Sequence, residues 1–85
     1  MDKIIVTIRD RNKRFTSYDL ELPTTVLIRQ LKKDIVETLN SYKKSLFLSD
    51  QNVVLTAPSL RRTLSDNETL DIAGVWNGDY IDFSN

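Results

Sequence analysis

The spacing of the apolar residues changes at Pro23, and this change constrains the fold more than any other feature of the sequence. Before Pro23, apolar and polar residues alternate along two segments, 3–10 and 15–22, as is typical of β-strands. After it, apolar residues recur every three or four positions to about Ser41, as they do on one face of an α-helix. A polar, turn-forming stretch separates the two strands, so residues 3–22 are predicted to form a β-hairpin that leads into a helix.

The first predicted strand is apolar on both faces. Ile4, Val6 and Ile8 share one face, while Ile5 lies on the other. A strand with two apolar faces suits the interior of a sheet better than its edge. We therefore expect residues 3–10 to form a central strand, with the last strand of the chain beside it.

The predicted helix begins shortly after Pro23, where the hydroxyl group of Thr24 or Thr25 can cap the first turn. Its apolar residues form one stripe, and such a stripe is more often packed in a core than left open for a partner. We therefore assign the stripe to the core. It consists of Ile28, Leu31, Ile35, Leu39 and Tyr42.

Beyond the helix, the apolar residues form short clusters. The first, Leu46-Phe47-Leu48, lies in a polar connector and is expected to plug one end of the core. Turn-forming residues separate the later clusters, and Asn77-Gly78 is a strong turn signal. These clusters predict a third strand at 53–55, a brief edge strand at 61–64 with Leu64 inward, one helical turn at 69–73 and a last strand at 79–83.

This order of elements predicts an α+β fold. A helix that crosses between a hairpin and later strands covers one face of a mixed sheet. With four to five strands packed on one α-helix, the arrangement is a β-grasp, and its order of elements resembles that of ubiquitin. A chain of 85 residues leaves room for one core, and without cysteine that core is stabilised by packing alone. We therefore expect residues 1–85 to form a single domain.

The composition argues against catalysis and against bound cofactors. The chain has no cysteine and no histidine, which removes the commonest general base and the commonest metal ligand. No phosphate-binding loop or other catalytic motif is present, so we expect no enzyme activity, no cofactor and no metal site. Nucleic-acid binding is a weaker alternative than protein binding, because the basic residues near the first turn belong to a chain of zero net charge.

The amino-terminal segment carries no targeting signal. Its apolar run, Ile4-Ile5-Val6, is too short for a signal peptide or a membrane span. We therefore expect a cytoplasmic protein without direct membrane insertion.

Four short strings resemble the motifs of a known family. They are Val-Thr-Ile at 6–8, Tyr-Asp-Leu-Glu-Leu-Pro at 18–23, Ile-Arg-Gln-Leu at 28–31 and Val-Trp-Asn-Gly-Asp at 75–79. Together they are similar to the YukD/EsaB family, small ubiquitin-like bacterial proteins encoded with the Gram-positive type VII secretion system. The resemblance implies a non-catalytic accessory or regulatory component that contacts membrane-anchored subunits of that system. Through such a partner, the protein is expected to be recruited to the inner face of the cell membrane.

A role as a conjugated modifier is not expected. A modifier needs a flexible tail that ends in Gly-Gly, because no larger residue fits where the activating enzyme grips the backbone. This chain ends in Phe83-Ser84-Asn85, so conjugation is excluded unless a longer precursor is trimmed. We expect noncovalent binding to other proteins, with the chain a monomer or a weak dimer.

Trp76 is the leading candidate for a partner-binding residue. The pattern assigns Val75 to the core, so Trp76 should point outward at the start of the following turn. The alternative is that its ring folds back over Leu64 or Ile72 and covers the core. The other candidates for partner binding are Asn77, Tyr80, Ile5, Arg61 and Arg62. For each of them the alternative is a residue with no role in binding, either covered by neighbouring side chains or simply exposed to solvent.

The charges are unevenly distributed along the chain. Residues 1–44 carry ten basic and six acidic side chains, a net charge of +4, and residues 45–85 carry two basic and six acidic, a net charge of −4. Solvated surface charge explains this distribution. The alternative function is a β-grasp adaptor unrelated to secretion, or a domain that associates with itself head to tail through its oppositely charged halves.

Overall fold

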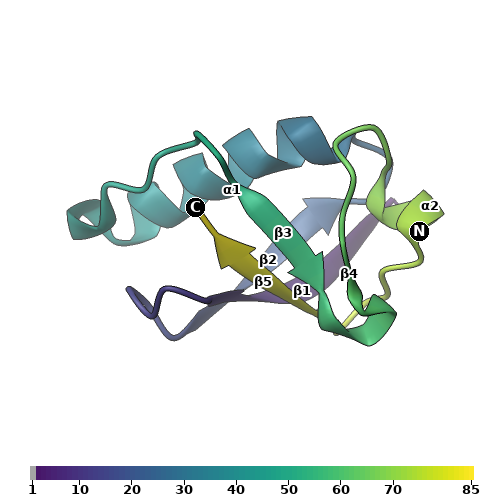
Figure 1. Ribbon diagram of the computed structural model, residues 1–85, viewed down its shortest axis with the longest axis horizontal. Helices are drawn as coiled ribbons and strands as arrows, with labels where there is room; N and C mark the ends of the chain where they lie inside the picture. Colours follow the sequence, from purple (N-terminus) through teal and green to yellow (C-terminus); the bar gives the residue numbers. More distant parts are fainter. Residues whose placement is uncertain (1) are drawn as a thin grey trace.

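Five strands form one mixed sheet in the order β2-β1-β5-β3-β4 (Figure 1). The computed structural model describes residues 2–85. The strands are β1 (Lys3–Asp10), β2 (Ser17–Pro23), β3 (Val54–Ala57), β4 (Arg62–Thr63) and β5 (Tyr80–Ser84). The helices are α1 (Ile28–Tyr42) and α2 (Leu70–Ala73), and two short 3₁₀ turns are η1 (Lys44–Leu46) and η2 (Pro58–Leu60). This is the predicted ubiquitin-like β-grasp, with all five strands present.

β1 occupies the interior of the sheet, as its two apolar faces predict. It pairs antiparallel with β2, so that Val6 faces Leu20, and parallel with β5, so that Ile8 faces Ile81. These four side chains are buried on the inner face. Ile5 points to the other face and is half exposed.

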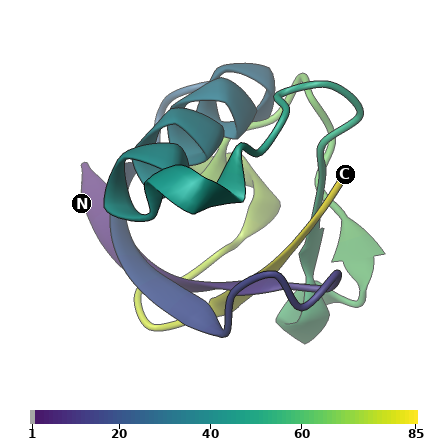
Figure 2. The ribbon, with the colours of Figure 1, turned by 90° about the vertical axis from the view of Figure 1, so that its left-hand side faces the viewer.

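α1 lies across the inner face of the curved sheet, as Figure 2 shows. Ile28, Leu31, Ile35 and Leu39 are completely buried, which confirms most of the predicted stripe. The assignment of Tyr42 to the core is wrong, because 58% of its surface is exposed. Its ring instead lies 5.6 Å from the ring of Tyr18 at the edge of the core.

The start of α1 is capped by distant backbone, and the predicted threonine cap is wrong. Leu27 is the N-cap residue and no side chain caps it. The first two free N–H groups of the helix donate to the carbonyl oxygens of Glu68, at 2.9 Å, and Asp66, at 3.3 Å. These bonds satisfy the N–H groups whose hydrogen bonds a capping hydroxyl group would otherwise accept. Thr24 is buried, and its backbone binds Asp2 and Asp71.

The connector after α1 packs only in part as predicted. Leu48 is buried and Leu46 is partly buried against the core, but Phe47 is 85% exposed. The side chain of Asn40 fixes the connector in place by donating to the Leu48 carbonyl oxygen at 2.9 Å and accepting from the Leu48 N–H at 2.8 Å. Phe47 then takes a left-handed conformation with φ of 48°, which costs about 1 kcal/mol for a residue with a side chain.

The later strands form where predicted, within one or two residues. β3 extends to Ala57 because Pro58 begins a 3₁₀ turn and offers no N–H group to a neighbouring strand. β4 is a two-residue edge strand, and Leu64 directly after it is buried as predicted. Ile81 and Phe83 of β5 point inward and are completely buried.

A buried carboxylate closes the turn between β1 and β2. The side chain of Asp10 has no exposed surface and accepts hydrogen bonds from the backbone N–H groups of Asn12 and Arg14 and from the guanidinium of Arg14. Burial raises the pKa of Asp10, but these hydrogen bonds outweigh burial and hold the pKa below its ordinary value. Arg14 also donates to Asn85, which ties the turn to the end of β5.

Replacing this carboxylate should destabilise the protein. We expect Asp10→Ala to lower the free energy of unfolding by about 2–3 kcal/mol, because it leaves two N–H groups and a partly buried guanidinium without their acceptor. Urea denaturation measures the change. Asp19→Ala is the matched control, because it removes one exposed hydrogen bond from Thr7 and should cost less than about 1 kcal/mol. Equal losses in the two variants would contradict the structural role of Asp10.

Candidate protein-binding surface

The end of α2 determines which way Trp76 points. Thr69 caps α2 by accepting a hydrogen bond from the N–H of Ile72, and Gly74 ends it in the left-handed conformation with φ of 86°. The N–H of Val75 then donates to the carbonyl of Leu70, which buries the Val75 side chain. The next residue faces away from the core, and Trp76 is 76% exposed. Its ring therefore does not fold back to cover the core.

Four hydrogen bonds hold the turn that carries Trp76. The N–H of Trp76 donates to the carboxylate of Asp79 at 2.8 Å, and the N–H of Asp79 donates back to the Trp76 carbonyl at 3.0 Å. The side chain of Asn77 accepts from the N–H of Ile5 at 2.7 Å, and the N–H of Gly78 donates to the Ile5 carbonyl at 2.7 Å. Asn77 thus anchors the turn to β1, and Trp76 is presented by a fixed backbone.

A hollow of about 370 Å³ lies beside Trp76. Ile4 and Val75 contribute its apolar surface, and the exposed carboxylate of Asp71 stands at its edge. Ile72 on α2 is 80% exposed and adds a second large apolar side chain to this end of the molecule. We call Trp76, Ile72, Asp71 and the hollow the Trp76 surface.

Sequence reasoning missed Ile72 and Asp71 as members of this surface. The signal for Ile72 was present, because Leu70 and Ile72 are two positions apart in a single helical turn and so cannot share one face. With Leu70 completely buried, Ile72 must point to solvent.

Ile5 and Tyr80 lie on the open face of the sheet, next to the anchored turn. Both are about half exposed. The guanidinium of Arg9 lies 4.4 Å from the centre of the Tyr80 ring, and its Nε binds the carboxylate of Asp82 at 2.8 Å. Charged groups therefore cover part of this face, in contrast to the open surroundings of Trp76.

Arg61 and Arg62 lie apart from Trp76 along the chain, at the edge strand β4. Arg62 forms a two-pronged ion pair with Glu68, with N–O distances of 2.7 and 2.8 Å. Glu68 also accepts the backbone N–H of Ser65, so this pair holds the loop that caps α1. The hydrogen bonds from Arg62 and then from Ser65 lower the pKa of Glu68 to about 2. Arg61 is exposed and ends η2 in the left-handed conformation.

The oppositely charged halves of the sequence are joined in the fold. Arg9 pairs with Asp82 and Lys32 pairs with Asp66, so basic residues of the first half neutralise acidic residues of the second. Both ion pairs reduce the charge separation on which head-to-tail association depends. That association stays a prediction.

Residues 2–85 contain neither a cluster of metal-binding side chains nor a helix that could span a membrane. Nowhere in this range do three or more acidic side chains gather closely enough to hold a metal ion. Neither α1 nor α2 has the length and apolar character to cross a bilayer.

The sheet order and the single long helix packed on it define a ubiquitin-like fold. The ubiquitin of Caldiarchaeum subterraneum superposes with a TM-score of 0.71 at 22% identity, over 95% of this chain and 90% of that one. The ubiquitin-like domain of the Arabidopsis thaliana protein At2g32350 gives a TM-score of 0.73 at 20% identity, over 99% of this chain and 78% of that one. These likenesses concern the fold.

Sequence comparison identifies the family. Residues 3–81 match the family described as the WXG100 protein secretion system (Wss) protein YukD. The chain belongs to this family, as the short motifs predict. A comparison with curated proteins finds no match.

The Arg62–Glu68 pair should make stability depend on pH in the acid range. Because the folded pKa of Glu68, about 2, lies below its ordinary value of 4.5, its contribution is complete above about pH 5 and is lost as the pH falls toward 2. The difference in unfolding free energy between the wild type and Glu68→Gln should therefore shrink over this range. Urea denaturation at each pH measures it.

The same substitution in an Arg62→Gln background is the control. Without the guanidinium the main cause of the low pKa is gone, so the effect of Glu68→Gln should vary much less with pH. An equally steep dependence in both backgrounds would show that Arg62 does not lower the pKa of Glu68.

Proposed function

We propose that residues 1–85 act as one non-catalytic, ubiquitin-like domain that binds proteins through the Trp76 surface. Its role is that of a cytoplasmic accessory or regulatory component of a type VII secretion system, and its partner is a membrane-anchored subunit of that system. Binding is noncovalent, and the domain is not a conjugated tag. The observation that carries the proposal is the exposed Trp76 ring, 76% accessible, on a turn fixed by four hydrogen bonds.

A tryptophan presented in this way has the properties of an interface anchor. Tryptophan is the residue type most enriched among the few that dominate binding energy, because a large flat ring loses much water-exposed surface on contact. The hydrogen-bonded turn orders the Trp76 backbone before the partner arrives, which reduces the entropy lost on binding. Family membership, through residues 3–81, supports the secretion system as the source of that partner.

The chemistry of the surface indicates what its partner offers. Trp76 and Ile72 require apolar side chains, and the hollow beside Trp76 has room for one of them. Asp71 at the edge favours a basic residue next to that apolar contact. Ile5 and Tyr80 extend the surface across the open sheet face as peripheral contacts. Arg61 remains a candidate for an acidic group on the partner.

A non-catalytic role agrees with the chemistry that the chain has available. It has neither histidine nor cysteine, so a proton-transfer or nucleophilic site would depend on serine, threonine, lysine or a carboxylate. The two shifted carboxyl groups, Asp10 and Glu68, are each occupied by an arginine and by backbone N–H groups that hold the fold.

An affinity purification tests the proposal. The tagged protein is recovered from detergent-solubilised membranes of its native cells, and bound proteins are identified by mass spectrometry. We expect the wild type to recover membrane-anchored secretion subunits. Trp76→Ala should weaken that binding by roughly thirtyfold, the effect of about 2 kcal/mol at an anchor residue.

Phe47→Ala is the matched control. It removes an aromatic ring that is 85% exposed, more than Trp76, from a different loop, and should leave recovery unchanged. Urea denaturation should show that Trp76→Ala changes the unfolding free energy by no more than about 0.5 kcal/mol, as for an exposed residue. If wild type and Trp76→Ala recover the same subunits equally, the Trp76 surface is not the docking site. If the wild type recovers none, the proposed place in secretion is wrong.

A further inference from the structure

The end of the molecule opposite the Trp76 surface is strongly basic. Two segments lie at this end, the β1–β2 turn and, above it in both ribbon views, the connector that follows α1 (Figures 1 and 2). The molecule is 33 Å long and about 21 Å across, so this end is well separated from α2 and the turn that carries Trp76. The two segments carry Arg11, Lys13, Arg14, Lys43 and Lys44.

The positive charge of this end is not balanced locally. Asp10, directly before the turn, has a buried carboxylate that is occupied by Arg14. The connector also carries Asp50, which lines a different hollow with Asp34, Glu37 and Lys33, and Asp19 on β2 accepts a hydrogen bond from Thr7. The remaining basic side chains, Arg11, Lys13, Lys43 and Lys44, are all exposed.

Phe47 protrudes from the same end. Its ring is 85% exposed although Leu46 and Leu48 on either side of it pack against the core. The two hydrogen bonds between Asn40 and Leu48 prevent the connector from rotating to bury the ring. An exposed aromatic ring therefore lies on the same connector as Lys43 and Lys44, three residues after Lys44.

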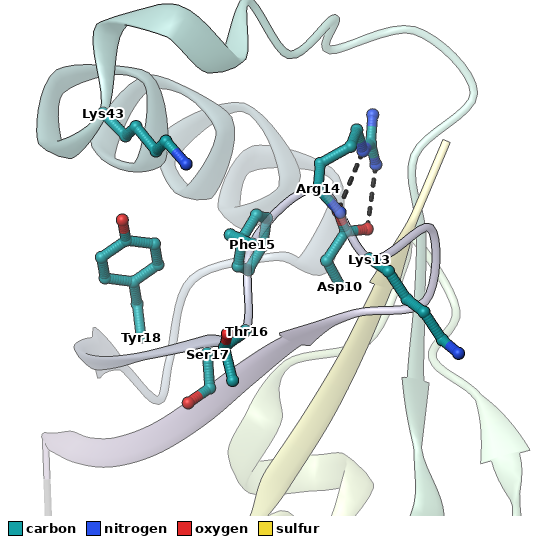
Figure 3. Close-up of a pocket in the computed structure, with 8 residues that line it drawn as sticks. All are labelled: Asp10, Lys13, Arg14, Phe15, Thr16, Ser17, Tyr18 and Lys43. Atoms are coloured by element: carbon teal, nitrogen blue, oxygen red, sulfur yellow. Dashed lines mark hydrogen bonds and ion pairs between the residues drawn. The ribbon is translucent and has the colours of Figure 1, made fainter.

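A polar hollow of about 650 Å³ lies between the two segments (Figure 3). In this view Lys43 extends toward the Phe15 ring and the hydroxyl group of Tyr18 points toward Lys43, while Lys13 extends away from both. An ammonium and a hydroxyl group that line one hollow are suitable donors for phosphate oxygens.

We propose that this basic end adsorbs to the surface of a bilayer that contains anionic phospholipids. The Phe47 ring enters the headgroup layer, the exposed lysines and arginine lie over the negative surface, and one headgroup phosphate occupies the hollow beside Lys43. Aromatic rings with adjacent basic residues favour this boundary between water and lipid. The protein lies on the membrane and does not span it. Adsorption to the membrane goes beyond the proposed function, since it is a second interaction at the opposite end of the molecule. The Trp76 surface stays free for a protein partner.

The shape of this end favours a bilayer over an acidic protein. A stable protein interface buries about 800 Å² on each side around an apolar, well-packed centre. Here the exposed large side chains with apolar surface are two separate rings, Phe47 and Tyr42, and the hollow is lined mainly by polar and charged side chains. A fluid surface of phosphate groups needs no shape complementary to isolated rings, so the charge and the Phe47 ring together suffice.

Vesicle flotation tests the proposal. The purified protein is mixed with vesicles of phosphatidylcholine alone or of phosphatidylcholine with phosphatidylglycerol, at low ionic strength. We expect flotation with the anionic vesicles only, and loss of most binding in 0.5 M salt because the attraction is screened. Soluble glycerophosphoglycerol at the same phosphate concentration should not compete, because it offers no surface for the ring.

Two variants and two controls locate the surface. Lys43→Gln/Lys44→Gln should weaken vesicle binding by roughly fivefold for each charge removed, and Phe47→Ser should weaken it further. Arg29→Gln/Lys33→Gln removes two charges from the first turns of α1, and Ile72→Ser removes an exposed apolar residue from α2. Both controls should bind vesicles almost as the wild type does. Equal losses in variants and controls would overturn the proposed orientation.

Tryptophan fluorescence gives a readout that does not depend on affinity. Trp76 is the only tryptophan of the chain, and its emission should not shift when anionic vesicles are added to the wild type. In Phe47→Trp with Trp76→Phe, the emission should move to shorter wavelength as the indole leaves water. A shift of Trp76 in the wild type, or no shift at position 47, would show that this end does not meet the membrane. So would a failure to float with anionic vesicles, or full competition by glycerophosphoglycerol.

Discussion

The parallel pairing of β1 with β5 is the contact on which the rest of the structure depends. It places the first strand beside the last, and every other element is arranged around this pair. The same pairing continues beyond the strands, where the backbone of Ile5 binds Asn77 and Gly78, and the N–H of Arg11 binds the carbonyl of Phe83. Both ends of the molecule, the turn that carries Trp76 and the β1–β2 turn, are therefore fastened by contacts between residues more than sixty positions apart.

Much of the fold follows from spacing alone. Alternation along residues 3–22 and the three-to-four spacing after Pro23 predict the hairpin and the long helix, because burial of one face requires those periods. The errors arise where backbone groups distant in the sequence determine the local structure. A nearby threonine is a sound local signal for a helix cap, yet the carbonyl groups of Asp66 and Glu68 cap α1 instead. Sequence alone does not reveal that this loop returns to the start of the helix.

The candidate site was predictable to a similar extent. The burial of Val75 predicts that Trp76 points outward, and the structure agrees. The roles of Asn77 and Arg62 were not predictable, because local sequence patterns do not show which groups lie next to these side chains. Asn77 accepts a hydrogen bond from the Ile5 N–H, and Arg62 pairs with the Glu68 carboxylate. Phe47 shows the same limit. Three consecutive apolar residues cannot all face inward, and the side chain of Asn40 determines which one is left outside.

The length of the molecule has a consequence for the geometry of an assembly at the membrane. With the basic end on the lipid surface, the Trp76 surface stands off from it by about the 33 Å of the long axis. A segment that leaves the bilayer in extended form gains at most about 3.5 Å per residue, so it reaches this height only after about ten residues. In the proposed orientation, a partner that reaches the Trp76 surface would therefore need its docking segment at least that many residues from its membrane anchor.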